Sequence, residues 1–278
     1  MIRIVVDSSA DYSMKELKEK NMQQVSLTIT VGEKNYRGGV DITADELYEM
    51  LIAGEKFPKT SQPSPQDFYE IFEDAKEKGD SVVCITLSSG LSGTFQSATL
   101  AKNMSDYPEI YIVDSLATSH LIRIMADYAC KLRDEGMRAS EIAEAVSRLK
   151  SRVKVLAAVD TLEFLYKGGR LNKATAVIGD LANLKPIITL LEDGTLSVTG
   201  KCLGRNKALA YITKAMAEKN IDHDFPVYSL YAYGSENTEK LEQKLEEIGI
   251  HCQKRQQLGA TIGTHVGPGA FAVIYVEK

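Results

Sequence analysis

Three segments of this chain combine hydroxyl, glycine and acidic residues in a way that is typical of anion sites and tight turns. They are Asp7-Ser8-Ser9-Ala10-Asp11, Thr60-Ser61-Gln62-Pro63-Ser64-Pro65 and Ser88-Ser89-Gly90-Leu91-Ser92-Gly93-Thr94. Hydroxyls donate hydrogen bonds to anions, and glycine allows backbone N–H groups to approach a ligand closely. The third segment has neither the Gly-Lys-Ser/Thr ending of a P-loop nor the Gly-x-Gly-x-x-Gly dinucleotide pattern, so it does not predict nucleotide binding. Ordinary capped turns remain the alternative interpretation of each segment.

Two later segments add a cation and an imidazole. They are Lys167-Gly168-Gly169-Arg170-Leu171 and Gly263-Thr264-His265-Val266-Gly267-Pro268-Gly269. An arginine can pair bidentately with a carboxylate or phosphate. We expect His265 to lie in a stiff loop shaped by glycine and proline, just before the last apolar strand, where the backbone can approach a ligand. His120, His223 and His251 have no such context and are interpreted as structural or exposed.

These residues form a set of donors for holding an anion and include little that breaks bonds. The sequence shows no Gly-x-Ser-x-Gly elbow, no nucleophile–base pair and no His/Cys or carboxylate spacing that suits a metal. We therefore expect no catalytic residue, no metal and no cofactor. One alternative is an enzyme acting on a small anionic metabolite, with His265 as general acid/base and Arg170 as clamp. Another is a protein-interaction module.

Strand-like and helix-like segments alternate along the chain, which predicts an α/β fold. In open α/β sheets, ligands bind at the carboxyl ends of strands, where several of the polar segments fall. Residues 57–65 are interpreted as an ordered loop. The predicted strands are 2–6, 25–31, 81–87, 110–113, 153–159, 227–231, 251–257 and 271–276, with a hairpin at 186–191 and 195–200. The predicted helices are 13–20, 43–52, 65–78, 91–103, 116–135, 140–150, 161–166, 173–181, 205–218 and 235–248.

The pattern changes near residue 152 and indicates two α/β domains. Residues 1–152 are predicted to form a Rossmann-like N-terminal domain with a mainly parallel sheet, and residues 153–278 a smaller domain with a mixed sheet. A net charge of −5 argues against a general nucleic-acid binder. The four cysteines are far apart, as expected of reduced, mostly buried cysteines in a cytosolic protein. The N-terminus does not resemble a signal peptide, and the apolar runs are strand-sized. We therefore expect a cytoplasmic protein without stable membrane insertion, whose membrane contact is at most transient.

Taken in order, these motifs, together with Val113-Asp114-Ser115, resemble those of the DegV family of bacterial fatty-acid-binding proteins, over essentially the whole chain. The resemblance implies two α/β domains with a long-chain fatty acid of the palmitate, stearate or oleate type buried between and within them. Its acyl chain would lie in an apolar tunnel. By motif match, Thr60 and Ser92 would bind the carboxylate, and Ser61, the Gly93 backbone, Arg170 and His265 would complete or border the cluster. Candidate wall residues are Ile29, Phe95, Ile122, Ile124, Phe164, Ile178 and Leu184.

The resemblance also implies a partner. In the best-understood members, the protein is the lipid-carrying subunit of a bacterial fatty acid kinase and presents the carboxylate to a separate ATP-binding subunit. Relatives often carry a basic pair after the position of Lys201, whereas this chain has Cys202-Leu203-Gly204-Arg205. Leu203 thus stands where an arginine is expected, although Arg205 and Lys207 are close by. Lipid binding is therefore better supported than the kinase partnership.

Overall fold

The first half of the chain forms a parallel sheet, as the sequence predicts. The computed structural model describes residues 1–54, 56–171 and 183–278. The sheet order is β2-β1-β6-β7, and every neighbouring pair is parallel. The strands are β1 (Ile2–Asp7), β2 (Met22–Val25), β6 (Ser81–Thr86) and β7 (Ile110–Asp114). Their carboxyl ends meet at one edge, so the loops that follow β1, β6 and β7 lie together.

Helices cover both faces of this parallel sheet. On one face, α3 (Pro65–Lys78) and α4 (Thr94–Ser105) bury Phe68, Phe72 and Ala98 against the strands. On the other face lie α5 (His120–Asp134) and α6 (Ala139–Leu149), while α1 (Met14–Glu19) lies beside β2. A short 3-10 turn, η1 (Ser8–Ala10), follows β1. The sheet is thereby enclosed between two layers of helix, which explains its nearly uninterrupted apolar strands.

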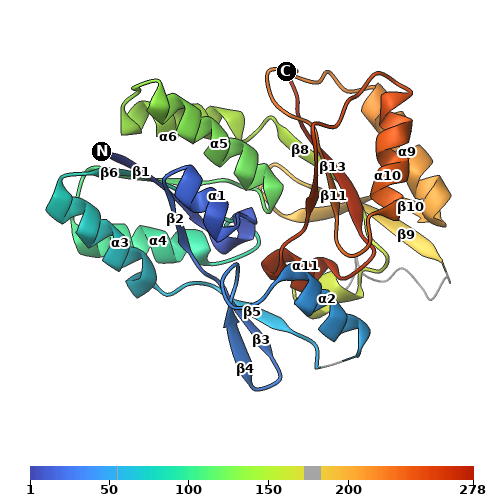
Figure 1. Ribbon diagram of the computed structural model, residues 1–278, viewed down its shortest axis with the longest axis horizontal. Coiled ribbons are helices and arrows are strands. Elements are labelled where there is room, and N and C mark those ends of the chain that lie inside the picture. The colour runs from blue at the N-terminus through green and yellow to red at the C-terminus, as the bar shows by residue number, and fades with distance from the viewer. Residues whose placement is uncertain (55, 172–182) are drawn as a thin grey trace.

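The second half forms a mixed sheet of order β10-β9-β8-β13-β11-β12 (Figure 1). Only β11 and β12 are parallel, and the other neighbours are antiparallel. The strands are β8 (Val153–Ala158), β9 (Leu184–Leu190), β10 (Leu196–Leu203), β11 (Tyr228–Tyr231), β12 (Lys254–Gln257) and β13 (Phe271–Val276). The helices are α7 (Glu163–Lys167), α9 (Arg205–Ala217), α10 (Glu236–Glu246) and α11 (Ala260–Val266). The predicted α/β fold with one parallel and one mixed sheet is confirmed.

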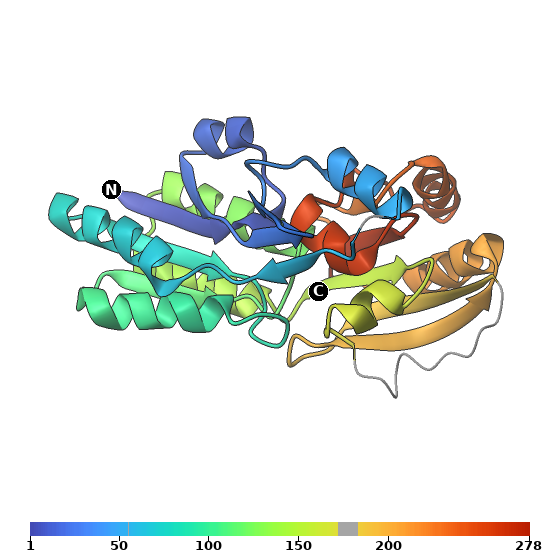
Figure 2. The same cartoon turned by 90° about the horizontal axis from the view of Figure 1, so that it is seen from below.

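A small third sheet connects the two halves. It has the order β4-β3-β5 and is built from β3 (Thr28–Val31), β4 (Lys34–Arg37) and β5 (Lys59–Ser61). The adjoining helix α2 (Ala44–Ile52) packs on α11, and Ile29 and Leu47 share one apolar cluster with Ala260. Figure 2 shows α2, in blue, beside α11, in red. A segment early in the chain therefore rests on an element close to its end.

Three sequence predictions in this region were wrong. The single strand predicted at 25–31 is two strands, β2 and β3, in different sheets. The predicted loop at 57–65 contains β5, which is held by antiparallel pairing with β3. His265 lies in helix α11 rather than in a loop, and this helix ends only at Gly267, with φ +73°. A side chain at Gly267 would place its Cβ only 2.3 Å from Phe164 Cδ2, so glycine is required there.

Several helices and strands also begin at other residues than the sequence predicts. Helix α4 begins at Thr94 instead of residue 91. Helix α5 begins at His120 instead of residue 116 because Leu116 and Ser119 have φ values of +50° and +53°, outside the helical region. The strand predicted at 251–257 begins at Lys254. The helix predicted at 173–181 lies outside the described residues.

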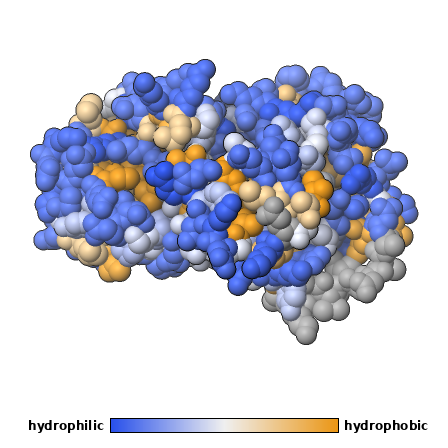
Figure 3. Space-filling model, turned by 60° about the horizontal axis from the view of Figure 1, so that its bottom comes forward, coloured by the Kyte–Doolittle hydropathy of each residue, from blue (hydrophilic) through white to orange (hydrophobic). Residues whose placement is uncertain are grey.

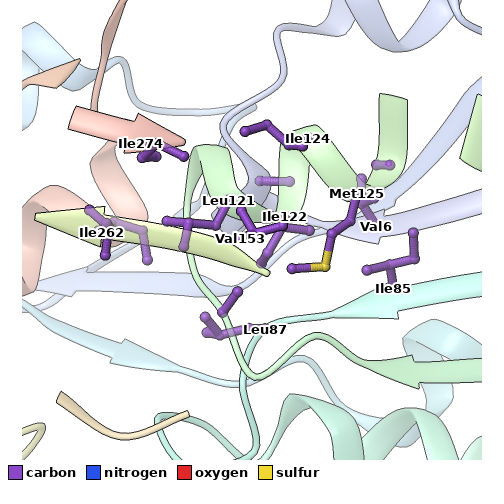
Figure 4. Packing of buried hydrophobic residues seen from close by; sticks show 14 of the residues in the cluster. Val6, Ile85, Leu87, Leu121, Ile122, Ile124, Met125, Val153, Ile262 and Ile274 are labelled. Carbon is purple, nitrogen blue, oxygen red and sulfur yellow. The ribbon is translucent and has the colours of Figure 1, made fainter. Parts of the chain in front are cut away.

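A continuous apolar core joins the two halves. Figure 4 shows Val6 and Ile85 of the parallel sheet packed with Met125 of α5, whereas Ile274 of the mixed sheet lies at the other side of the same cluster, beyond Leu121 and Ile122. Hydrophilic side chains cover most of the face in Figure 3, and apolar side chains appear there in separate spots. All four cysteines are free thiols. Within residues 1–54, 56–171 and 183–278, no helix has the length and apolar character needed to cross a bilayer.

Candidate functional site

A pocket lies where the two halves meet, with about 880 Å³ of space between its walls, part of which is open to solvent. Its walls come from the mixed sheet, from β5, from the loops that follow β6 and β7, and from α5, α7 and α11, and most of the wall residues are aliphatic. Representative wall residues are Leu27, Leu87, Leu121, Ile188, Leu230 and Ile262. An apolar ligand in this pocket would exchange contact with water for contact with these aliphatic side chains.

Of the wall residues expected from the sequence, those in the described part of the chain do not line this cavity. Of the seven, Ile178 lies outside the described residues. Ile122 and Ile124 pack in the core, whereas their neighbour Leu121 reaches the cavity, because successive helix residues point in different directions. Ile29 belongs to the cluster around α2, and the Phe164 ring stacks on Phe57 with centroids 5.6 Å apart. Phe95 and Leu184 are half-buried elsewhere.

Thr60 and His265 form a polar pair on the cavity wall. Thr60 is the central residue of β5, and His265 lies near the end of α11. Thr60 Oγ1 is 2.7 Å from His265 Nε2, which is a hydrogen bond between residues 205 positions apart. The third sheet therefore brings a hydroxyl group from the first half of the chain to an imidazole ring from the second half.

His265 is held in its neutral form. Burial, with a further contribution from the positive charge of Arg170, lowers the pKa of His265 to about 3. Its Nδ1 atom is buried and has no hydrogen-bond partner within the described part of the chain. A Cβ atom on Gly168 would lie 2.2 Å from this nitrogen, so only glycine fits beside it. A neutral imidazole with so low a pKa is a poor general acid at pH 7, which weighs against the enzymatic alternative.

Arg170 supplies a positive charge to the same wall. Its Nε donates to the Leu91 carbonyl at 3.0 Å, and its Nη1 donates to the Gly168 carbonyl. Burial lowers the pKa of Arg170, yet an arginine remains protonated at any physiological pH. Among the described residues, no carboxylate pairs with it. A half-buried cation beside an apolar cavity, with no carboxylate partner in residues 1–54, 56–171 and 183–278, favours an anionic ligand group.

Ser92 joins this cluster from the loop after β6. Its side chain lines the cavity, and Ser92 Oγ lies 2.9 Å from Thr94 Oγ1. The next residue, Gly93, is the N-cap of α4, and no side chain caps this helix end. The end of a 12-residue helix carries partial positive charge, which adds to the attraction for an anion. A Cβ on Gly93 would lie 1.9 Å from Gln62 Oε1, so the close approach of Gln62 requires glycine.

The structure thus brings together four of the six predicted site residues: Thr60, Ser92, Arg170 and His265 all line the cavity. We refer to these four as the head-group cluster. Gly93 is adjacent to Ser92 but is not a wall residue. Ser61 is exposed and contributes to β5 through its pairing with Thr28.

The sequence analysis missed a second group of polar wall residues: Thr118, Ser119, Thr189 and Thr261. Ser119 Oγ donates to Asp11 Oδ2 at 2.6 Å and lies 3.0 Å from His120 Nδ1. Burial raises the pKa of Asp11 to about 7, although hydrogen bonds from Ser119 and the Gly259 backbone act in the opposite direction. The sequence offered no signal for Thr118 and Ser119, because both fall within the helix predicted at 116–135.

His120 has a structural role within this buried network. Only 1% of its surface is exposed, and burial is the main cause that lowers its pKa to about 3. Arg123 lies one helical turn further on, donates to the Asp11 carbonyl at 3.2 Å and forms an ion pair with Glu16. The network therefore ties α5 to η1 and α1.

The structure is thus an α/β fold with a mainly apolar pocket whose wall carries a cationic and hydroxyl-bearing cluster. A family model described as "Uncharacterised protein, DegV family" matches residues 1–278, and the chain belongs to the DegV family. A DegV domain-containing protein of Caldanaerobacter subterraneus subsp. tengcongensis is 37% identical, with 100% of this chain and 99% of the relative covered.

Solved structures agree with this assignment. The chain is similar to a DegV family protein of Thermus thermophilus described by its fatty acid binding, with 33% identity, a TM-score of 0.89 and coverage of 100% and 99%. It is also similar to DegV of Bacillus subtilis, described as a fatty acid binding protein, with 29% identity, a TM-score of 0.84 and the same coverage.

Proposed function

We propose that this protein binds a long-chain fatty acid, with its acyl chain in the apolar cavity and its carboxylate at the head-group cluster. The observation that carries the proposal is the placement of Arg170, which lacks a carboxylate partner in the described part of the chain, on the wall of an otherwise mainly aliphatic cavity. The fatty acid binding of the Thermus thermophilus and Bacillus subtilis relatives supports it. A carboxylic acid with a long alkyl chain can pack against the aliphatic walls and pair its carboxylate with Arg170 at the same time.

The energetics favour such a ligand. Burial of one CH2 group is worth about 0.8 kcal/mol, so a C16 chain gains on the order of 10 kcal/mol before the entropic loss of binding. A buried carboxylate is unfavourable unless several donors reach it. Thr60, Ser92 and Arg170 provide such donors, and His265 shares a hydrogen bond with Thr60. The acyl chain of the ligand thus supplies most of the affinity, and the head-group cluster fixes the position of the carboxylate.

We assign the remaining predicted residues to the border of the site. Ser61, exposed at the end of β5, and the Gly93 backbone would contact the carboxylate or its surrounding water from the rim. The division into domains 1–152 and 153–278 remains part of this proposal, with the lipid lying between and within them. The ligand would then hold the two halves together.

We further propose that the protein is a cytoplasmic, non-catalytic carrier that presents a palmitate-, stearate- or oleate-type acid to an ATP-binding kinase subunit. The surface expected to dock this subunit has little free positive charge at its centre. Leu203 is 54% exposed, and Arg205 Nη2 is paired with Asp160 at 3.0 Å. Lys207 is exposed beside them and leaves a cation for docking. If docking is electrostatic, Leu203→Arg should strengthen phosphorylation of the bound lipid without altering lipid affinity.

Native mass spectrometry of gently purified protein tests the lipid proposal. We expect an added mass equal to a C16–C18 fatty acid, and uptake of palmitate or oleate by protein from which lipid has been removed. A protein that carries no lipid and takes up neither acid would contradict the proposal. A matched experiment with acetate and succinate examines the small-anion enzyme alternative, which predicts binding of these and not of the long-chain acids.

A further inference from the structure

The inner face of the mixed sheet lines the pocket with alanines on two of its strands. Ala157 of β8 and Ala272 of β13 both line the pocket, and the two strands are neighbours in the sheet (Figure 1). Ala272 lies directly opposite Ala157 in the antiparallel register. The pocket residues that come from α5, α7 and α11 are larger: Leu121, Leu165, Thr261, Ile262, His265 and Val266. Small side chains on the sheet therefore make part of the room in the pocket.

The two alanines stand in a row whose other members are bulky. On the far side of Ala272, the paired residue is Leu230 of β11, and on the far side of Ala157 it is Ile188 of β9. All four residues line the pocket. Neighbouring strands lie about 4.7–4.9 Å apart, so the sheet has a dip two strands wide between two large aliphatic side chains.

Sheet formation does not favour alanine at these positions. Alanine is depleted in strands, where β-branched and aromatic residues are preferred. The alternate residues of β13 are large, since Phe271, Val273 and Tyr275 pack on the opposite face in the cluster that contains residues of α9 and α10. A small side chain on the face of a sheet gives up packing contacts, which lowers stability. Two adjacent alanines at this place are explained if a ligand supplies the missing contacts.

We propose that Ala157 and Ala272 determine which acyl chains the protein accepts, because the dip that they leave in the sheet receives part of the acyl chain. This inference rests on the proposed function and specifies its selectivity. The head-group cluster fixes the carboxylate, and the alanine pair sets how far an acyl chain extends beyond it. A larger side chain at either position would take the place of methylene groups of the ligand. The same side chain would fill space in the lipid-free protein.

The test measures the affinity for saturated acids from octanoate to stearate in the wild type and in the separate variants Ala157→Val and Ala272→Val. In the wild type, we expect affinity to rise with each CH2 group that is buried. In each variant, this rise should stop at a shorter acyl chain, and palmitate should bind at least about tenfold more weakly, within the range that overpacking produces. The melting temperature of each lipid-free variant should equal or exceed that of the wild type, because valine fills space and suits a strand.

Ala158→Val is the matched control. Ala158 is the next residue of β8, so its side chain points to the opposite face, where it is buried in one cluster with Ala208 and Leu209 of α9. This variant should lower the melting temperature through overpacking and should keep the dependence of affinity on acyl-chain length that the wild type shows.

Three outcomes overturn the inference and leave fatty acid binding by the wild type intact. The first is a dependence on acyl-chain length in either valine variant that parallels the wild type. The second is an equal loss of affinity at every length, which would place the alanines at the carboxylate. The third is a lipid-free valine variant that melts below the wild type or does not fold, because the alanines would then serve packing alone. Failure of every acid to bind the wild type overturns the proposed function itself.

Discussion

Removal of two hydroxyls from the head-group cluster gives the sharpest test of where the carboxylate lies. Thr60 lies in β5 and Ser92 in the loop after β6, yet both line the cavity. Thr60 Oγ1 is 2.7 Å from His265, and Ser92 Oγ is 2.9 Å from Thr94, so both are short side chains held in place by neighbours. We expect the double variant Thr60→Ala/Ser92→Ala to fold and to lose two donors to the ligand.

The expected loss of affinity follows from the charge of the ligand. A hydrogen bond to a charged group is worth about 1.5–3 kcal/mol, and the lower figure is appropriate here because each hydroxyl gives up a protein partner on binding. Two such bonds amount to about 3 kcal/mol, which is about a 100-fold increase in the dissociation constant. Coupling through His265 can change this figure, so the single variants must be measured as well.

Displacement of a fluorescent fatty acid by palmitate measures the dissociation constant, and native mass spectrometry measures lipid retained through purification. Thr99→Ala is the control, because it removes a hydroxyl from α4 that does not face the cavity. A double variant with a dissociation constant within about threefold of the wild type would refute the reasoning, since even one lost charged hydrogen bond exceeds that effect. The carboxylate would then lie elsewhere.

Three further predictions concern the same cluster. Arg170→Lys should weaken palmitate binding about tenfold, because lysine keeps the positive charge but lacks the planar guanidinium that donates to the Leu91 and Gly168 carbonyls. Unchanged palmitate affinity in the displacement assay would show that the charge alone suffices. Gly168→Ala should lower stability by about 1–3 kcal/mol in urea unfolding, because the new Cβ would lie 2.2 Å from His265 Nδ1, and a wild-type midpoint would disprove this contact. His265 has a folded pKa of about 3 against an ordinary value of 6.5, so its contribution to stability is complete above pH 6.5 and is lost as the pH falls toward 3. His265→Gln should therefore flatten the acid side of the stability curve, by at most about 1.4 kcal/mol per pH unit, and an identical pH profile would contradict the assignment.

Much of the fold was predictable because its signals are local. Apolar runs such as β1 and β6 and capping boxes such as Ser13 with Glu16 depend on near neighbours, and the structure contains them. The third sheet was not predictable, because β5 is a strand only through its pairing with β3. The start of α5 was missed for a related reason: the positive φ of Ser119 accompanies its bond to Asp11, 108 residues away.

The candidate site was predictable as a set of motifs but not as a geometry. The ordered motifs singled out Thr60, Ser92, Arg170 and His265 on residue type and resemblance, and these four line one cavity. The residues that line the cavity were not predictable, because the sequence pattern of an aliphatic residue is the same whether it packs in a core or faces a cavity. Thr118 and Ser119 were missed because both fall within the helix predicted at 116–135.

The bond between Thr60 and His265 has a consequence for how the protein is made. Its two residues are separated by 205 positions, so at synthesis rates of about 5–20 residues per second the first waits roughly 10–40 s for the second. During that time, Ile29 and Leu47 lack the α11 surface that Ala260 provides. A ribosome-bound chain that stops before residue 260 would therefore show an apolar segment open to chaperones and, lacking His265, would be unable to assemble its complete binding site.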